Sequence, residues 1–90
     1  MYEITGIKLS SRPPRLEVIS DYLFTGRNGE ADVWVNKPNA VDWVSKNYHK
    51  VYVAGGGASA WVEVVNANPP YLRTEADGTT SDNLLSLPVY

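Results

Sequence analysis

The opening stretch of the chain alternates apolar and polar residues, and the alternation changes phase partway along. Tyr2 and Ile4 are apolar at even positions, whereas Ile7 and Leu9 are apolar at odd positions, with Gly6 between the two pairs. Alternation with a period of two is typical of a β-strand. A glycine at the point where the inward face shifts by one residue is typical of a β-bulge. We therefore expect a strand here, with a bulge at Gly6.

The second apolar stretch predicts a long antiparallel hairpin. Residues 16–25 place leucine, valine, tyrosine and phenylalanine on one face of a strand, and residues 31–35 alternate again. Asn28-Gly29 lies between them, and this dipeptide favours a hairpin turn because both residues tolerate a positive φ angle. We expect residues 15–25 to pair antiparallel with residues 30–36 through this turn.

A helical period replaces the alternation after the hairpin. The apolar residues that recur at this period are Ala40, Val41, Val44 and Tyr48. Pro38 suits the first turn of a helix, where its missing N–H costs nothing. Asn36 suits the N-cap, because its side-chain oxygen can accept from a free backbone N–H of the first turn. Asp42 and Lys46 are spaced for an ion pair one turn apart. One short helix, packed onto a sheet, is expected.

The second half of the chain predicts another hairpin and a short extended piece. Residues 50–54 and 58–67 both alternate, and Gly55-Gly56-Gly57 separates them. The prolines of Asn68-Pro69-Pro70 end the second strand, because proline cannot donate a hydrogen bond to a sheet. Residues 71–74 are expected to extend the chain once more before a turn.

The last residues predict a turn followed by one helical turn. Asp77-Gly78 favours the turn, Asp82 is expected to cap the helical turn, and Pro88 ends it. The apolar residues of this segment are Leu72, Leu84, Leu85 and Leu87. Because each of these leucines needs a partner surface, we expect residues 71–88 to pack onto the body and to be required for folding.

The order of elements is therefore β-β-β-α-β-β with a C-terminal tail. Strands dominate, hairpins join them, and one helix covers them, which predicts the α+β class with an antiparallel β-sheet and one short helix packed on it. The chain has 90 residues, which is room for one domain, so residues 1–90 are expected to form a single small α+β domain.

Composition and charge narrow the classes of function. The chain has no cysteine, which excludes disulfides, thiolate metal sites and cysteine nucleophiles. Residues 1–50 carry seven Lys and Arg against six Asp and Glu, and residues 51–90 carry one Arg against four acids. Nucleic-acid binding is disfavoured, because phosphate contacts need a basic surplus that a net charge of −2 does not supply. No apolar stretch approaches the ~20 residues of a membrane span or forms a signal peptide, so a cytoplasmic protein with no membrane partner is expected.

The C-terminal third carries a resemblance to a known family. Tyr71-Leu72-Arg73-Thr74, then Asp77-Gly78, then Asp82-Asn83-Leu84 before Pro88 resembles the C-terminal signature of the domain of unknown function 3892. That family consists of small bacterial and phage-associated domains. The opening strand and the helix around residues 41–44 are also similar in place and type, whereas the hairpin at residues 15–36 is longer than the usual form. The resemblance implies no function and no catalytic residue.

The residues that could carry chemistry have structural explanations. His49 is the only histidine and is expected at a solvated corner between helix and strand, without a nucleophile beside it. The three glycines lack the lysine and the following helix of a phosphate loop, so they predict a hairpin tip. Asp77 and Asp82 are explained by the turn and the cap. Arg73 is expected to pair with Asp82 or Glu75, and an anionic ligand is the alternative. No catalytic residue, metal site or cofactor is predicted.

The three tryptophans are the best functional clue. Trp34, Trp43 and Trp61 each fall off the main apolar face of their element. They either cover a second, smaller core or form a binding surface. Alternation places Trp34 and Trp61 on the outer face of the sheet, with Tyr52 nearby. We expect at least one of these two indoles to be substantially exposed.

The sequence thus favours a non-enzymatic binding module. The predicted binding residues are Trp34, Trp61, Tyr52 and Arg73, and the expected partner is a protein or a second copy of this chain as a homodimer. One alternative is a phage-borne inhibitor whose acidic C-terminal half meets a basic bacterial defence protein. The other is nucleic-acid binding, with bases stacked on aromatic rings. The basic residues that this alternative would use are Lys8, Arg12, Arg15 and Arg27.

Overall fold

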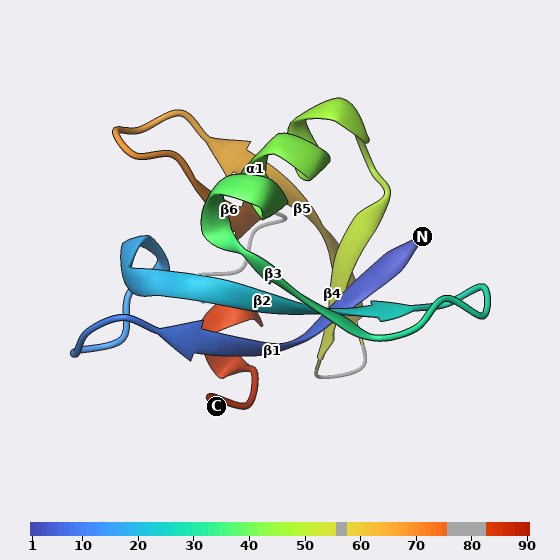
Figure 1. Cartoon of the computed structure of the whole chain (residues 1–90), viewed down its shortest axis with the longest axis horizontal. Coiled ribbons are helices and arrows are strands. Elements are labelled where there is room, and N and C mark those ends of the chain that lie inside the picture. The colour runs from blue at the N-terminus through green and yellow to red at the C-terminus, as the bar shows by residue number, and fades with distance from the viewer. Residues whose placement is uncertain (56–57, 76–82) are drawn as a thin grey trace.

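The elements follow the order that the hydrophobic pattern predicts (Figure 1). The computed structural model describes residues 1–55, 58–75 and 83–90. The strands are β1 (Tyr2–Leu9), β2 (Ile19–Gly26), β3 (Val33–Asn36), β4 (Val51–Gly55), β5 (Ala58–Val65) and β6 (Tyr71–Thr74). The helices are α1 (Lys37–Lys46) and the 3-10 turns η1 (Leu16–Val18) and η2 (Asn83–Ser86). The α+β class is confirmed.

The strands form one six-stranded sheet in the order β3-β2-β1-β4-β5-β6. Every neighbouring pair is antiparallel except β1 and β4, which run parallel. The expected antiparallel sheet is therefore a mixed one. The reason is the helix: α1 carries the chain from the β3 edge back across the sheet, so that β4 enters beside β1 in the same direction. In Figure 1, α1 lies above β2, and the red C-terminal segment passes β1 and ends below it.

The bulge expected in β1 is confirmed. The register with β2 shifts between Ile4 and Gly6, so Ile4 pairs with Phe24 and Gly6 pairs with Leu23. The shift lets Ile4 and Ile7 both reach the core, where each is buried. The phase change in the sequence therefore marks the place where the strand bends to keep its apolar residues inside.

The predicted hairpin is confirmed over residues 21–24 and 33–36, whereas its expected extension over residues 15–18 and 30–32 is corrected, since neither range is part of a strand. β2 and β3 are antiparallel, from Asp21 opposite Asn36 to Phe24 opposite Val33. Gly29 in the connection has a φ of +88°, as the Asn-Gly dipeptide predicts. The expected strand over residues 16–18 is wrong, because these residues form the 3-10 turn η1. The chain reverses direction between β1 and β2 in this connection, and η1 forms its last three residues.

The helix has the predicted cap and ion pair. The side-chain oxygen of Asn36 accepts from the backbone N–H of Asn39 at 3.0 Å. Lys46 Nζ lies 3.2 Å from an oxygen of Asp42. Ala40, Val41 and Val44 are buried, whereas the placement of Tyr48 on the same face is wrong. The helix ends at Lys46, and the Tyr48 side chain is 74% exposed.

The C-terminal residues fill an opening between β1 and β4. The parallel pairing of these strands covers only two residue pairs, Tyr2 with Val51 and Glu3 with Tyr52. Farther along β1, the N–H of Ile7 donates to the C=O of Pro88 at 3.0 Å, and the N–H of Tyr90 donates to the C=O of Ile7 at 2.9 Å. The tail therefore pairs with a part of β1 that β4 leaves unpaired.

One core joins the two halves of the sheet. Its fully buried residues include Ile4, Tyr22, Val53, Leu72 and Leu84. The expectation that the C-terminal segment packs onto the body is thus confirmed for two of its leucines, whereas Leu85 is exposed. The predicted turn at residues 77–78, the cap at residue 82 and the tip at residues 56–57 lie outside the described residues. No helix in the described part of the chain is long and apolar enough to cross a membrane.

Candidate functional site

Trp34 lies on β3 and is partly covered by the C-terminus. Its side chain is 36% exposed, which agrees with the expected exposure of at least one indole. The ring of Tyr90 meets it edge-on at a centroid distance of 5.4 Å. Lys8 Nζ lies 4.7 Å from its ring centroid, within the range of a cation–π interaction. Part of the Trp34 ring is thus covered by Tyr90 and Lys8 of the same chain.

Trp61 belongs to a column of stacked rings. His49 stacks on Trp61 at 4.9 Å, and Tyr48 stacks on the other face of His49 at 3.8 Å. Tyr52, opposite Trp61 in the β4–β5 ladder, meets it edge-on at 6.2 Å. The sequence predicted the closeness of Tyr52 and Trp61, and it missed the histidine between two aromatic rings.

The expectation of a solvated surface histidine is only partly right, because the side chain is 35% exposed at the corner between α1 and β4 but its ring is stacked and hydrogen-bonded. His49 is half-buried, and its Nε2 donates to the Glu75 carboxylate, whose oxygens lie 2.8 and 2.9 Å away. The φ angle of His49 is +55°, in the left-handed region, which interrupts strand alternation just before β4. This backbone angle accounts for the error, because periodicity gives no warning that a side chain will turn to the other face.

Arg73 pairs with a different carboxylate from the two expected. Its Nε lies 3.3 Å from Glu63, the residue directly opposite it in the β5–β6 ladder. Glu75 is occupied by His49, and Asp82 lies outside the described residues. Cross-strand register decides this pairing, since opposite charges directly across a ladder attract at short range.

The four predicted binding residues do not form one site. Tyr52, Trp61 and Arg73 lie on β4, β5 and β6, whereas Trp34 lies on β3, at the opposite end of the strand order. Three strands, β2, β1 and β4, separate Trp34 from Trp61. A single patch built on both indoles is therefore ruled out by the topology.

A pocket that the sequence reasoning missed lies between β3 and α1. Its volume is about 190 Å³, and its lining residues are Tyr2, Phe24, Val33, Val35, Asn39 and Trp43. The Trp43 ring stands edge-on to the rings of Tyr2 at 5.6 Å and Phe24 at 6.1 Å. The Tyr2 and Phe24 rings are tilted by 48° to each other, and the three rings together line an apolar pocket, which we call the aromatic pocket. One residue of this pocket could have been inferred from the sequence. Tyr2 lies two positions before Ile4, which is buried, so both side chains are expected on the inner face of β1.

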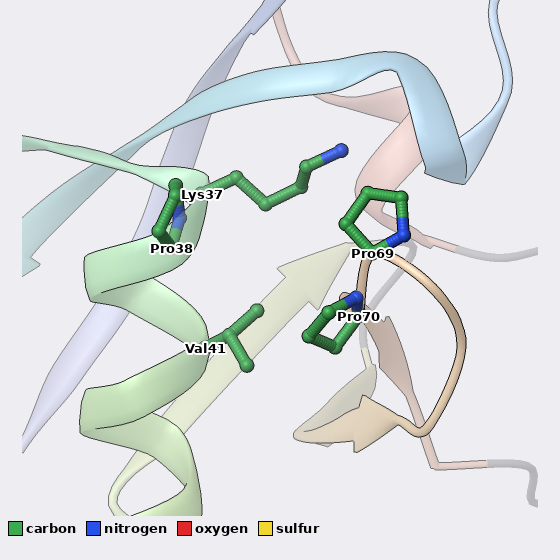
Figure 2. A pocket seen from close by; sticks show the side chains of 5 residues that line it. All are labelled: Lys37, Pro38, Val41, Pro69 and Pro70. Atoms are coloured by element: carbon green, nitrogen blue, oxygen red, sulfur yellow. The ribbon is translucent and has the colours of Figure 1, made fainter.

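A second pocket of about 190 Å³ lies between the start of α1 and the β5–β6 connection (Figure 2). Lys37, Pro38 and Val41 line one side, and Pro69 and Pro70 line the other. The Lys37 side chain extends from the helix toward Pro69, and its Nζ donates to the C=O of Glu17 at 2.8 Å. The charged group of this pocket is therefore already bound to the chain.

Charged groups gather around the β2–β3 connection. Arg27 binds Glu3, and this hydrogen bond raises the pKa of the guanidinium. The backbone N–H of Asn28 donates to Glu30 at 2.7 Å and lowers the pKa of that carboxyl. Glu30 also lies 3.8 Å from the Met1 amino group, whereas Asp32 is exposed and has no ion-pair partner among the described residues.

In the described ranges, no three His, Cys, Asp or Glu side chains gather in a way that could hold a metal ion. The surfaces instead offer aromatic rings, two small apolar pockets and paired charges. The chain is thus a small α+β domain with partly exposed aromatic rings on its surface.

Comparison with known proteins identifies the family. The profile described as Protein of unknown function (DUF3892) matches residues 3–88, so the chain belongs to this family. The match extends from β1 through η2 and is not confined to the C-terminal signature. No curated protein and no solved structure matches the chain.

Proposed function

We propose that this chain is a non-enzymatic protein-binding module and that the aromatic pocket is its contact site. The observation that carries the proposal is the place of the pocket, beside the edge strand β3, with Val33 of that strand 47% exposed at its rim. An apolar pocket with one or two polar groups is the usual form of a recognition site. Here the polar group is the Asn39 amide.

The residue types of the pocket support a protein partner. Tryptophan, tyrosine and phenylalanine are enriched at protein contacts, and aromatic anchors there contribute much of the binding energy. Phe24 is buried at the base, while Tyr2 and Trp43 are only partly covered. The volume suits one apolar side chain of a partner better than a whole cofactor, since small-molecule sites usually start at about 300 Å³.

The proposal is tested with a displayed library of random peptides selected on the folded protein. Selected peptides are then titrated against Val33→Asn, which makes the pocket rim polar at an exposed position. Val89→Asn is the matched control, because Val89 is similarly exposed but lies on the C-terminal tail.

The expected result is peptide binding that weakens at least about tenfold in Val33→Asn and is unchanged in Val89→Asn, as expected for loss of an apolar contact. The proposal would be overturned if the selection yields no binding peptide, or if the selected peptides bind Val33→Asn as tightly as the parent protein.

A further inference from the structure

The strand β3 is an open edge of the sheet. Within residues 1–55, 58–75 and 83–90, β3 pairs with β2 and with no other strand. The opposite edge strand, β6, contacts both η1 and η2. An unpaired edge presents backbone N–H and C=O groups that can accept another strand. Helix α1 lies near both edge strands, and β6 has η1 and η2 near it in addition, so β3 is the less covered of the two edges.

The ladder shows which backbone groups face outward. Ile7 uses both its N–H and C=O on the C-terminal tail, so its pair with Tyr22 is a non-hydrogen-bonded one. Alternation along an antiparallel ladder then turns Tyr22 toward β3 and Leu23 toward β1. Trp34, opposite Leu23, therefore turns its own N–H and C=O away from β2, toward the open edge.

The aromatic pocket runs along this same edge. Val33 and Val35, on either side of Trp34, form one wall of the pocket, and Asn39 and Trp43 of α1 form the other. In a strand added beside β3, side chains at alternate positions would point to the same face as these valines. One of those side chains would meet the pocket while the backbone pairs with Trp34.

One carboxylate at this edge favours a cationic group on the ligand. Asp32 precedes β3, is exposed and has no ion-pair partner among the described residues, whereas Glu30 lies 3.8 Å from the Met1 amino group. Lys37 donates to the C=O of Glu17 and Lys8 lies over the ring of Trp34, so neither is paired with Asp32. A second copy of this chain, paired antiparallel about Trp34, would set Asn36 and no cation opposite Asp32. A segment of another protein with Lys or Arg at that place would form an opposite-charge pair across the ladder.

We propose that an extended segment of a partner protein adds to the sheet as a strand beside β3. Its backbone pairs with Trp34, one apolar side chain enters the aromatic pocket, and a Lys or Arg side chain approaches Asp32. Backbone pairing supplies affinity and the pocket supplies specificity, as in other complexes formed by strand addition. This inference rests on the proposed function and specifies its ligand and geometry.

The first experiment tests backbone pairing. The tightest peptide from the selection is synthesised again with single N-methyl groups at each successive backbone nitrogen. The protein variants Trp34→Pro and Trp34→Ala are compared in parallel, since both lose the indole and only the first loses the backbone N–H. Proline is tolerated at an edge position whose N–H faces solvent. If Trp34→Pro does not fold, the methylated peptides still decide the matter.

The expected result is a loss of at least about tenfold in affinity at alternate N-methyl positions, and a further loss in Trp34→Pro relative to Trp34→Ala. The amide proton of Trp34 should exchange more slowly in the complex. Asp32→Asn should weaken binding severalfold, whereas Asp42→Asn, on the exposed side of α1, should not.

The outcomes separate the two proposals. Peptides that bind the pocket but tolerate every N-methyl group would overturn strand addition and leave the binding function intact. A selection that yields no peptide removes both. A peptide-free protein that elutes as a dimer, with the Trp34 amide already protected, would show a second copy at this edge and would also overturn the inference.

Discussion

His49 is the residue whose environment departs most from its sequence pattern. Histidine is among the few residue types enriched in the left-handed region, where a side chain costs ~1–2 kcal/mol relative to the ordinary helical region. Here the angle turns the ring between Tyr48 and Trp61 and onto Glu75. The ring contacts and the hydrogen bond offset the cost of the backbone angle.

Replacing this ring is expected to destabilise the protein. His49→Ala should lower the free energy of unfolding by about 1–2 kcal/mol, because it removes two ring contacts and the hydrogen bond to Glu75. Tyr48→Ala, at an exposed position, should change it by less than about 0.5 kcal/mol. Urea denaturation measures the free energy of unfolding of both variants. A loss below about 0.5 kcal/mol in His49→Ala would mean that the His49 ring contributes little to stability.

Gly6 is required for a close approach of the C-terminus. A Cβ atom at this position would lie 2.6 Å from Cε1 of Tyr90, closer than carbon atoms can pack. Gly6→Ala should therefore push the Tyr90 ring off Trp34 and destabilise the protein by about 1 kcal/mol, at the low end for overpacking because Tyr90 is exposed and can move. Loss of nuclear Overhauser contacts between the two rings reports the displacement.

The double variant Gly6→Ala, Tyr90→Ala separates the clash from other effects of the alanine. Once the ring is removed, Gly6→Ala should cost much less than it does in the parent chain. A cost that stays the same in both backgrounds would place the effect in β1 itself.

At the scale of elements, the C-terminal segment is part of the core. β6 contributes Leu72 and η2 contributes Leu84, and both are fully buried. Burying each leucine contributes about 1.5–3 kcal/mol, a large share of the stability of a domain this small. A chain ending at Ala67 is thus expected to show no cooperative thermal transition by circular dichroism. Cooperative melting at the temperature of the full chain would contradict this expectation.

Elements with a local signal were predictable, and those set by distant partners were not. Gly6 marks the bulge, Asn28-Gly29 marks a hairpin, and Asn36 marks a helix start, because each is governed by backbone angles or by a bond within a few residues. The parallel pairing of β1 with β4 has no such signal. Nor does η1, where the need to reverse direction overrides the strand pattern of residues 16–18.

The same division explains the candidate site. The neighbourhood of Tyr52 and Trp61 followed from two adjacent strands. The aromatic pocket joins Tyr2, Phe24 and Trp43 from β1, β2 and α1, so it depends on tertiary placement that periodicity cannot give. The ion pair of Arg73 was assigned to the wrong carboxylate for a similar reason, since it depends on strand register.

For the whole molecule, the distribution of basic groups argues against nucleic-acid binding. The net charge is −2, and two of the four basic residues considered for that role, Arg27 and Lys8, contact Glu3 and Trp34. We expect no submicromolar binding of single- or double-stranded DNA or RNA in about 150 mM salt, because few cations remain to neutralise phosphates. Fluorescence anisotropy tests this. Tight binding that weakens in the double variant Arg12→Ala, Arg15→Ala would show that the protein is a nucleic-acid-binding domain.

The insertion of the tail beside β1 also bears on how the chain folds. Ile7 and Val89 are 82 positions apart (89 − 7), whereas the β1–β2 and β4–β5 ladders join residues much closer in sequence. Closing a long loop costs more entropy than closing a short one, so distant contacts usually form late. Val89→Ala and Tyr90→Ala should accordingly speed unfolding and leave the refolding rate nearly unchanged in stopped-flow measurements. If the refolding rate instead falls by the full change in stability, the tail is already in place in the transition state, and its contact with β1 forms early in folding.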